Sequence, residues 1–307
     1  MRKDFDDEKV PRPAPGDDAG VGVTRGGGVG YGATAREAAA LAAGMTQEER
    51  RAWLIRALAA ERDDLPGQAL EPPDDPQGQR RLLRALLNVR PPWPADPRLL
   101  AVQDAYLRAR LAERGGAVRV DTLPRTADGL ALWRGDITLL DADAIVNAAN
   151  SGLLGCFAPN HGCIDNAIHT FAGIQLRLEC AALVGARGGD EPAGRARITA
   201  GHNLPAAHVL HTVGPIVAGD GPTRRDEELL ASCYGACLDL AAARGLRSVA
   251  FCCISTGEFR FPNALAARVA VDTVRGWLRR NPSDMEVTFD VFKPVDERLY
   301  RELLTGD

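Results

Sequence analysis

From residue 118 onward, short apolar runs alternate with longer amphipathic stretches. Runs rich in β-branched and other apolar residues occupy 130–133, 144–149, 196–200, 209–213, 248–254 and 285–289. Apolar residues recur at helical spacing in 164–171, 226–244 and 263–280. This alternation predicts an α/β sandwich with helices on both faces of a mostly parallel sheet. Ligands of such sheets usually bind beyond the carboxyl ends of the strands.

The pattern before residue 118 is helical. Thr34 and Thr46 are each followed three residues later by a glutamate, which is the capping-box signature of a helix start. A third helix with a leucine stripe is stopped by Pro91, and a fourth begins at Pro97 and ends at Gly115. Stripes of this kind are typical of helices that pack on a core.

These patterns divide the chain into three parts. Residues 1–32 are rich in Gly, Pro, Asp and Arg and hold almost no large apolar side chains, so we expect a flexible tail. Residues 33–117 are predicted to form a helical extension. Residues 118–307 are predicted to form the α/β domain.

Charge and composition exclude several classes of protein. The 307 residues carry a formal net charge of −4, so the chain lacks the basic footprint of a nucleic-acid-binding protein. No apolar run approaches the ~20 residues that span a bilayer, and the N-terminus has no hydrophobic signal core. We therefore expect a cytoplasmic protein without membrane or nucleic-acid partners. All seven cysteines and five histidines follow residue 150, and an odd number of cysteines without a signal peptide indicates reduced thiols.

Three of these residues form a candidate metal site. Cys156, His161 and Cys163 lie within eight residues, in the spacing C-x4-H-x-C, on a stretch that glycine and proline can bend. Thiolate and imidazole ligands favour one zinc ion. Chance clustering of buried thiols is the alternative. Three local ligands leave a fourth position open, unless Cys180, His169 or a distant cysteine closes it.

Four polar segments follow the predicted strands and resemble the macrodomain family. They are Gly135-Asp136-Ile137-Thr138, Asp143-Ala144-Ile145-Val146-Asn147-Ala148-Ala149-Asn150, Cys163-Ile164-Asp165-Asn166-Ala167-Ile168-His169 and Ile254-Ser255-Thr256-Gly257-Glu258-Phe259-Arg260-Phe261-Pro262. The resemblance implies a three-layer α/β/α sandwich with a mixed, mostly parallel sheet. The stretch that carries Cys156, His161 and Cys163 is similar to that of the zinc-containing branch of the family. Comparable helical extensions also occur in that branch.

The resemblance implies a site for ADP-ribose. Asp136, with Ile137, matches the position that accepts the adenine amino group, although an Asp after a strand is also a common turn cap. Phe292 is similar to the aromatic residue that stacks on adenine, and core packing is an equal alternative. The diphosphate would bind at a loop that enters a helix, formed by Ser255, Thr256, Gly257, Glu258 and Phe259. Arg260 replaces a glycine usual in the family and either adds charge near the diphosphate or points to solvent.

The ribose and catalytic positions follow from the same resemblance. The amides of Asn147 and Asn150 can donate and accept hydrogen bonds, which suits ribose hydroxyls, and both are also ordinary turn residues. Asp165 matches an aspartate that assists catalysis in hydrolytic macrodomains, and a helix-capping role is the alternative. We expect Asn150 and Asp165 to be catalytic. His169 and His211 are interpreted as structural.

The resemblance implies a zinc-dependent hydrolase that removes mono-ADP-ribose from modified protein side chains. Zinc would polarise or orient a distal-ribose hydroxyl or a water. The expected partner is ADP-ribose or a mono-ADP-ribosylated protein, and the resemblance adds a lipoyl carrier protein as a further partner. Two alternatives stay open: a reader module that binds ADP-ribose around a structural zinc, and a hydrolase of small ADP-ribose esters.

Overall fold

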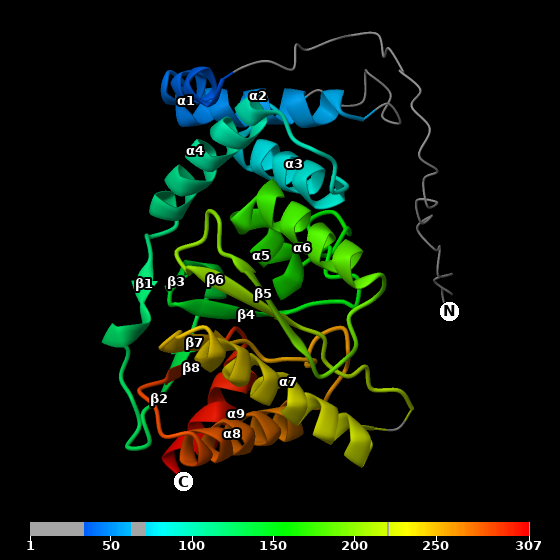
Figure 1. The fold of residues 1–307 in the computed structure, drawn as a ribbon. Coiled ribbons are helices and arrows are strands. Elements are labelled where there is room, and N and C mark those ends of the chain that lie inside the picture. Colours follow the sequence, from blue (N-terminus) through cyan, green and yellow to red (C-terminus); the bar gives the residue numbers. More distant parts are fainter. Residues whose placement is uncertain (1–33, 63–71, 220, 307) are drawn as a thin grey trace. The chain divides into compact units, whose positions relative to one another are not determined.

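The computed structural model describes residues 34–62, 72–219 and 221–306, so the predicted tail lies outside the described residues. Within these ranges the predicted α/β sandwich is confirmed. Six strands form one sheet in the order β2-β8-β7-β4-β6-β5 (Figure 1). Their bounds are β2 (Leu130–Arg134), β4 (Ala144–Ala148), β5 (Ala196–Ala200), β6 (His208–Thr212), β7 (Ser248–Phe251) and β8 (Glu286–Val291).

The sheet is mixed and mostly parallel. Every neighbouring pair runs parallel except β5 and β6, which pair antiparallel at one edge. Strand β4 holds a central position, and four of its five residues are buried, as expected for a strand covered on both faces. A separate parallel pair joins β1 (Val118–Arg119) to β3 (Leu140–Asp141). The carboxyl ends of the parallel strands therefore meet along one edge, where the polar segments begin.

Helices cover both faces of this sheet (Figure 1). Helices α5 and α6 lie on one face, and α7, α8 and α9 lie on the other. No helix of the described ranges is long and apolar enough to cross a membrane. The helices are α5 (Ile164–Ala172), α6 (Ile174–Arg187), α7 (Arg224–Ala243), α8 (Asn263–Arg280) and α9 (Pro294–Thr305), with short 3-10 turns η1 (Val120–Thr122) and η2 (Ile137–Leu139).

The N-terminal helices pack around a second apolar cluster. They are α1 (Ala35–Ala43), α2 (Gln47–Ala60), α3 (Pro76–Val89) and α4 (Pro97–Glu113). Both predicted capping boxes are present, because Thr34 and Thr46 accept hydrogen bonds from the main chain of Glu37 and Glu49. The second cluster consists of side chains from these helices and Ile174 of α6. Helix α3 also contacts α5, the helix that follows the candidate metal ligands.

Candidate functional site

The three predicted metal ligands lie together on the loop between β4 and α5. All their ligand atoms are within 4.8 Å of one another, and the Cys156 Sγ is 3.5 Å from His161 Nδ1. Cys163 is the N-cap of α5, where its sulfur accepts a hydrogen bond from the main-chain N–H of Asn166 at 3.4 Å. Among the described residues, this group contains no fourth histidine, cysteine or carboxylate. The loop can therefore hold a metal while leaving a coordination position open.

The two thiols of this group interact directly. Interaction with the Cys163 thiol lowers the pKa of Cys156 below its ordinary value, and His161 favours the same charged form. The same interaction, together with burial, raises the pKa of Cys163 above its ordinary value. Because metals bind cysteine as the thiolate, this shift favours the form of Cys156 that can ligate a metal.

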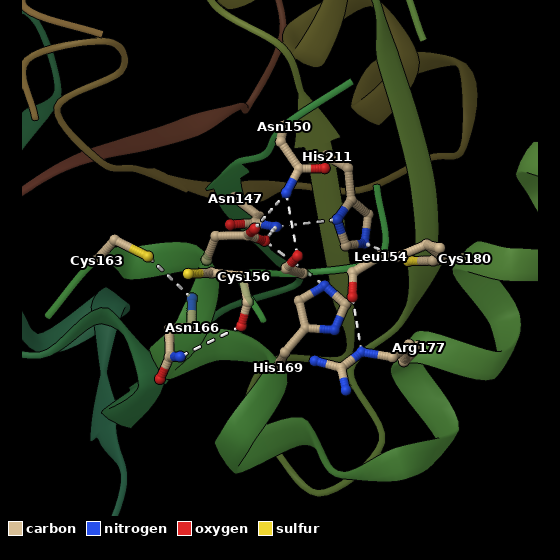
Figure 2. Close-up of polar contacts among 12 residues, drawn as sticks. Asn147, Asn150, Leu154, Cys156, Cys163, Asn166, His169, Arg177, Cys180 and His211 are labelled. Atoms are coloured by element: carbon tan, nitrogen blue, oxygen red, sulfur yellow. Dashed lines mark hydrogen bonds and ion pairs between the residues drawn. The ribbon is translucent and has the colours of Figure 1, made fainter. Parts of the chain in front are cut away.

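Asp165, the second residue of α5, is buried with only 5% of its surface exposed. Its carboxylate accepts hydrogen bonds from Asn147 Nδ2 at 2.8 Å and from Asn150 Nδ2 at 3.3 Å (Figure 2). The Asn150 amide also donates to the main-chain oxygen of Gly155 at 3.0 Å. Burial raises the pKa of Asp165 to about 7. The structure thus brings together Asn150 and Asp165, the two residues predicted to be catalytic.

Asn147 lies on β4 and contacts Asp165 from within the core. Its side chain is fully buried, and its Nδ2 faces His211 Nδ1 at 3.2 Å. His211 Nε2 lies 2.9 Å from Thr199 Oγ1 and 3.8 Å from the Cys180 sulfur. Burial lowers the pKa of His211 to about 3, so the ring is neutral. Asn147 therefore supports Asp165, and its direct contact with ribose stays a prediction.

Cys180 and His169, considered above as a fourth metal ligand, belong to this buried group with His211. Figure 2 shows these three side chains apart from Cys163. His169 Nε2 is 3.6 Å from Asp165 Oδ1, and burial holds the pKa of His169 well below its ordinary value. A neutral buried histidine agrees with the structural interpretation of His169.

The predicted phosphate loop connects β7 to α8. Ser255 has a left-handed backbone with φ of 64°, and its main-chain oxygen accepts a hydrogen bond from Phe261 N at 2.9 Å. Gly257 is exposed, which leaves its backbone accessible to a ligand. Arg260 also has a left-handed φ of 57° and donates to the Val217 main-chain oxygen at 3.1 Å. This contact ties the loop to the segment after β6.

The predicted phosphate loop contacts the loop between β4 and α5 (residues 149–163), which carries the predicted metal ligands and is called the metal loop below. Glu258 Oε1 lies 3.4 Å from His161 Nε2, and 73% of the Glu258 side chain is exposed. Thr256 is half-buried and its hydroxyl donates to the Cys253 main-chain oxygen at 3.0 Å, while Phe259 packs against the core. The two loops, which are almost 100 positions apart in the sequence, therefore flank one site.

The predicted adenine residues lie beyond β2 and β8. Asp136 caps η2, accepting a hydrogen bond from Thr138 N at 3.0 Å, and its other oxygen pairs with Arg114. The Ile137 side chain is buried in the core. Phe292 is 74% exposed, which excludes the core-packing alternative and leaves its ring free to stack. Their contact with a ligand stays a prediction.

Sequence reasoning missed several residues that support this site. Arg84 of α3 donates to the Asn166 side chain, 82 positions away, and Arg177 of α6 donates to Leu154 on the metal loop at 2.6 Å (Figure 2). Arg177 also donates to the Leu87 main-chain oxygen at 3.0 Å. Nothing in the local sequence marks these contacts, because each depends on how distant helices pack.

Comparison with known proteins agrees with this fold. Residues 146–270 match the model of the Macro domain family. A Treponema medium protein named protein-ADP-ribose hydrolase is 50% identical over 264 residues, which are 85% of this chain and 100% of that protein. A Staphylococcus aureus (strain MSSA476) protein of the same name is 44% identical over 262 residues, 85% of this chain and 97% of that protein. The crystal structure of a Trypanosoma brucei macrodomain in complex with ADP-ribose matches with a TM-score of 0.54 and 32% identity, covering 75% of this chain and 96% of that one. A match of this extent to whole proteins establishes that the chain belongs to the macrodomain family.

Proposed function

We propose that this protein is a zinc-dependent hydrolase that removes mono-ADP-ribose from modified protein side chains. Its relatives named protein-ADP-ribose hydrolase, at 44% and 50% identity over 85% of the chain, support the hydrolase activity. The observation that carries the proposal is the placement of Asp165. This buried carboxylate accepts hydrogen bonds from Asn147 and Asn150. Asp165 lies two positions after Cys163, a predicted metal ligand.

The nucleotide would extend from the adenine end to the metal loop. Phe292 would stack on the adenine and Asp136 would accept its amino group. Main-chain N–H groups of the loop from Ser255 to Phe259 would bind the diphosphate at the start of α8. The distal ribose would then lie beside Asn150. Its vicinal hydroxyls match an amide that both donates and accepts.

The donor set fits zinc. Bonds of about 2.3 Å to sulfur and about 2.0–2.1 Å to nitrogen, at tetrahedral angles, place a sulfur and a nitrogen ligand about 3.5 Å apart. Cys156 Sγ and His161 Nδ1 are 3.5 Å apart. Cys156, His161 and Cys163 would hold the ion, and a bound zinc supplies a Lewis acid beside the distal ribose. Three protein ligands with an open position are typical of catalytic zinc, which favours the hydrolase over the reader module.

The chain's own residues would orient the reaction. Asn150 holds Asp165 through Nδ2, which leaves its carbonyl oxygen available to a ribose hydroxyl. The Asp165 carboxylate would accept a hydrogen bond from the attacking water and fix its direction of approach. Burial of Asp165 keeps most of its carboxylate away from bulk solvent. The modified target stays open, and a lipoyl carrier protein stays a prediction from the resemblance.

The experiment compares wild type with Cys156→Ala. Zinc would be measured by mass spectrometry of the purified protein, and ADP-ribose release from a mono-ADP-ribosylated protein by chromatography. We expect about one zinc per wild-type chain and loss of both zinc and release in the variant. Cys237→Ala is the matched control, because this buried cysteine lies on α7 outside the ligand group, and it should keep both.

A second variant separates chemistry from binding. Asp165→Asn should keep zinc and ADP-ribose affinity while release falls by ~10²–10⁴-fold, the usual contribution of a positioned general acid or base. Release that survives loss of zinc would make the metal structural. Zinc without release from the protein substrate would favour the reader module, and release only from small ADP-ribose esters would favour the third function.

A further inference from the structure

Helix α3 of the N-terminal extension lies against the metal loop and contacts its backbone. Arg84 Nη2 donates to the main-chain oxygen of His161 at 3.1 Å. One helical turn later, Asn88 Oδ1 accepts from the main-chain N–H of Asn160 at 3.0 Å. Residues four apart share one face of a helix, so both side chains reach the same loop.

The Asn88 contact supports a strained turn. Asn160 has a left-handed φ of 56°, a conformation that asparagine tolerates better than most residues. Asn88 is 1% exposed, and its Nδ2 donates to Thr170 Oγ1 of α5 at 3.0 Å. Because both ends of the Asn88 amide are paired, its orientation is fixed between α5 and the turn that precedes His161.

The Arg84 contact continues to the other end of the loop through Asn166. The Arg84 Nε and Nη2 both donate to Asn166 Oδ1, at 3.1 and 2.7 Å. Asn166 Nδ2 in turn donates to the main-chain oxygens of Cys156 at 3.3 Å and Ala158 at 3.0 Å. Asn166 is fully buried, so water does not compete for these bonds. A continuous set of hydrogen bonds therefore runs from α3 to the backbone at both ends of the ligand group.

We propose that Arg84 and Asn88 are positioning residues of the metal site, which hold the loop in the conformation that brings Cys156, His161 and Cys163 together. Neither residue is a metal ligand. The inference rests on the proposed zinc site and assigns to the N-terminal extension a part in building it. Residues that orient ligands in this way typically change metal affinity by ~10–100-fold when they are replaced.

The test uses the full chain and the variant Arg84→Lys. Lysine keeps the positive charge but cannot form the planar fork that reaches Asn166 and the His161 carbonyl. The rate of zinc transfer from the protein to a chromogenic chelator should rise ~10–100-fold relative to wild type. Arg81→Lys is the matched control, because Arg81 is exposed on the same helix, and its transfer rate should equal that of wild type.

A second variant and a stability measurement keep the test specific. Asn88→Ala should also speed zinc transfer, and the unfolding midpoints of the zinc-free proteins show how far each variant loses general stability. Transfer as slow as wild type in both variants would overturn the positioning role while the zinc proposal stands. The positioning role would also be overturned if zinc transfer became faster only in proportion to the stability that the zinc-free variant loses. A wild-type protein that binds no zinc would overturn both proposals, and that result needs no variant.

Discussion

Replacing Arg177 by methionine tests how firmly the N-terminal helices are joined to the metal loop. Arg177 lies on α6 and is 5% exposed. Its guanidinium donates to the main-chain oxygen of Leu154 at 2.6 Å, on the loop after β4. It also donates to the main-chain oxygens of Leu87 at 3.0 Å and of Arg90, at the end of α3. One side chain thus bonds to both segments.

The magnitude follows from these contacts. Methionine fills a comparable volume but leaves two buried carbonyl oxygens and one partly buried carbonyl oxygen without their donor, each hydrogen bond being worth ~1.5–3 kcal/mol when the donor is charged. Burial opposes this gain, because it lowers the pKa of Arg177 to about 10, which corresponds to about 3 kcal/mol of cost for the charged form. We therefore expect Arg177→Met to lower the free energy of unfolding by about 2–5 kcal/mol and Tm by roughly 5–15 °C.

The assay is urea unfolding followed by far-UV circular dichroism, in chelator so that metal content is equal. Arg224→Met is the control, because Arg224 is 92% exposed and its ion pair with Glu228 is worth less than ~0.5 kcal/mol. A loss for Arg177→Met no larger than that of the control would refute the argument that these carbonyl contacts join the two segments.

Three further predictions concern the adenine end and pH. Phe292→Ala should weaken ADP-ribose binding ~5- to 150-fold, which is the contribution of one base stacked on an aromatic ring, without changing Tm. An affinity equal to that of wild type in calorimetry would contradict this. Arg114→Met removes the donor that orients Asp136, so the preference for ADP-ribose over its hypoxanthine analogue should fall ~5- to 10-fold in competition binding, whereas an unchanged preference argues against that role. Burial holds the pKa of Asp290 well above its ordinary value, so its stabilising contribution is present at acid pH and is lost as pH rises through the folded pKa. Asp290→Asn should therefore be more stable than wild type at pH 8 and nearly equal near pH 4 in urea unfolding, and a difference that does not depend on pH would refute this.

The six strands of the main sheet and the local part of the site were predictable because their signals are local, whereas the short strands β1 and β3 were not predicted. The apolar run predicted at 196–200 coincides with β5 (Ala196–Ala200), and Thr46 caps α2 as its spacing with Glu49 indicates. Cys156, His161 and Cys163 lie together because eight residues of bent chain cannot carry them far apart. Asn150 and Asp165 meet because β4 and α5 are consecutive elements.

Helix α6 shows why other features could not be predicted. It follows α5 directly after Gly173, which has φ of 95°, and no side chain of its own caps its start. Instead, Gln103 of α4 accepts a hydrogen bond from the Ile174 N–H at 2.9 Å. The cap comes from a residue 71 positions earlier, so no local motif marks the helix start. Arg84 and Asn166 were missed for the same reason, since their contact exists only after α3 packs on α5.

The second apolar cluster includes Ile174 of α6, and Phe171 and Leu178 pack against it. Its side chains therefore come from both sides of residue 118. A fragment that begins there would expose this apolar surface to water and would lose α3 from the metal loop. Residues 118–307 alone are thus a poor choice of fragment for a fusion protein. Substitutions at the contact between α1–α4 and the helices α5 and α6 should be accompanied by compensating substitutions on the other side, because each set of helices forms part of the other's packing surface.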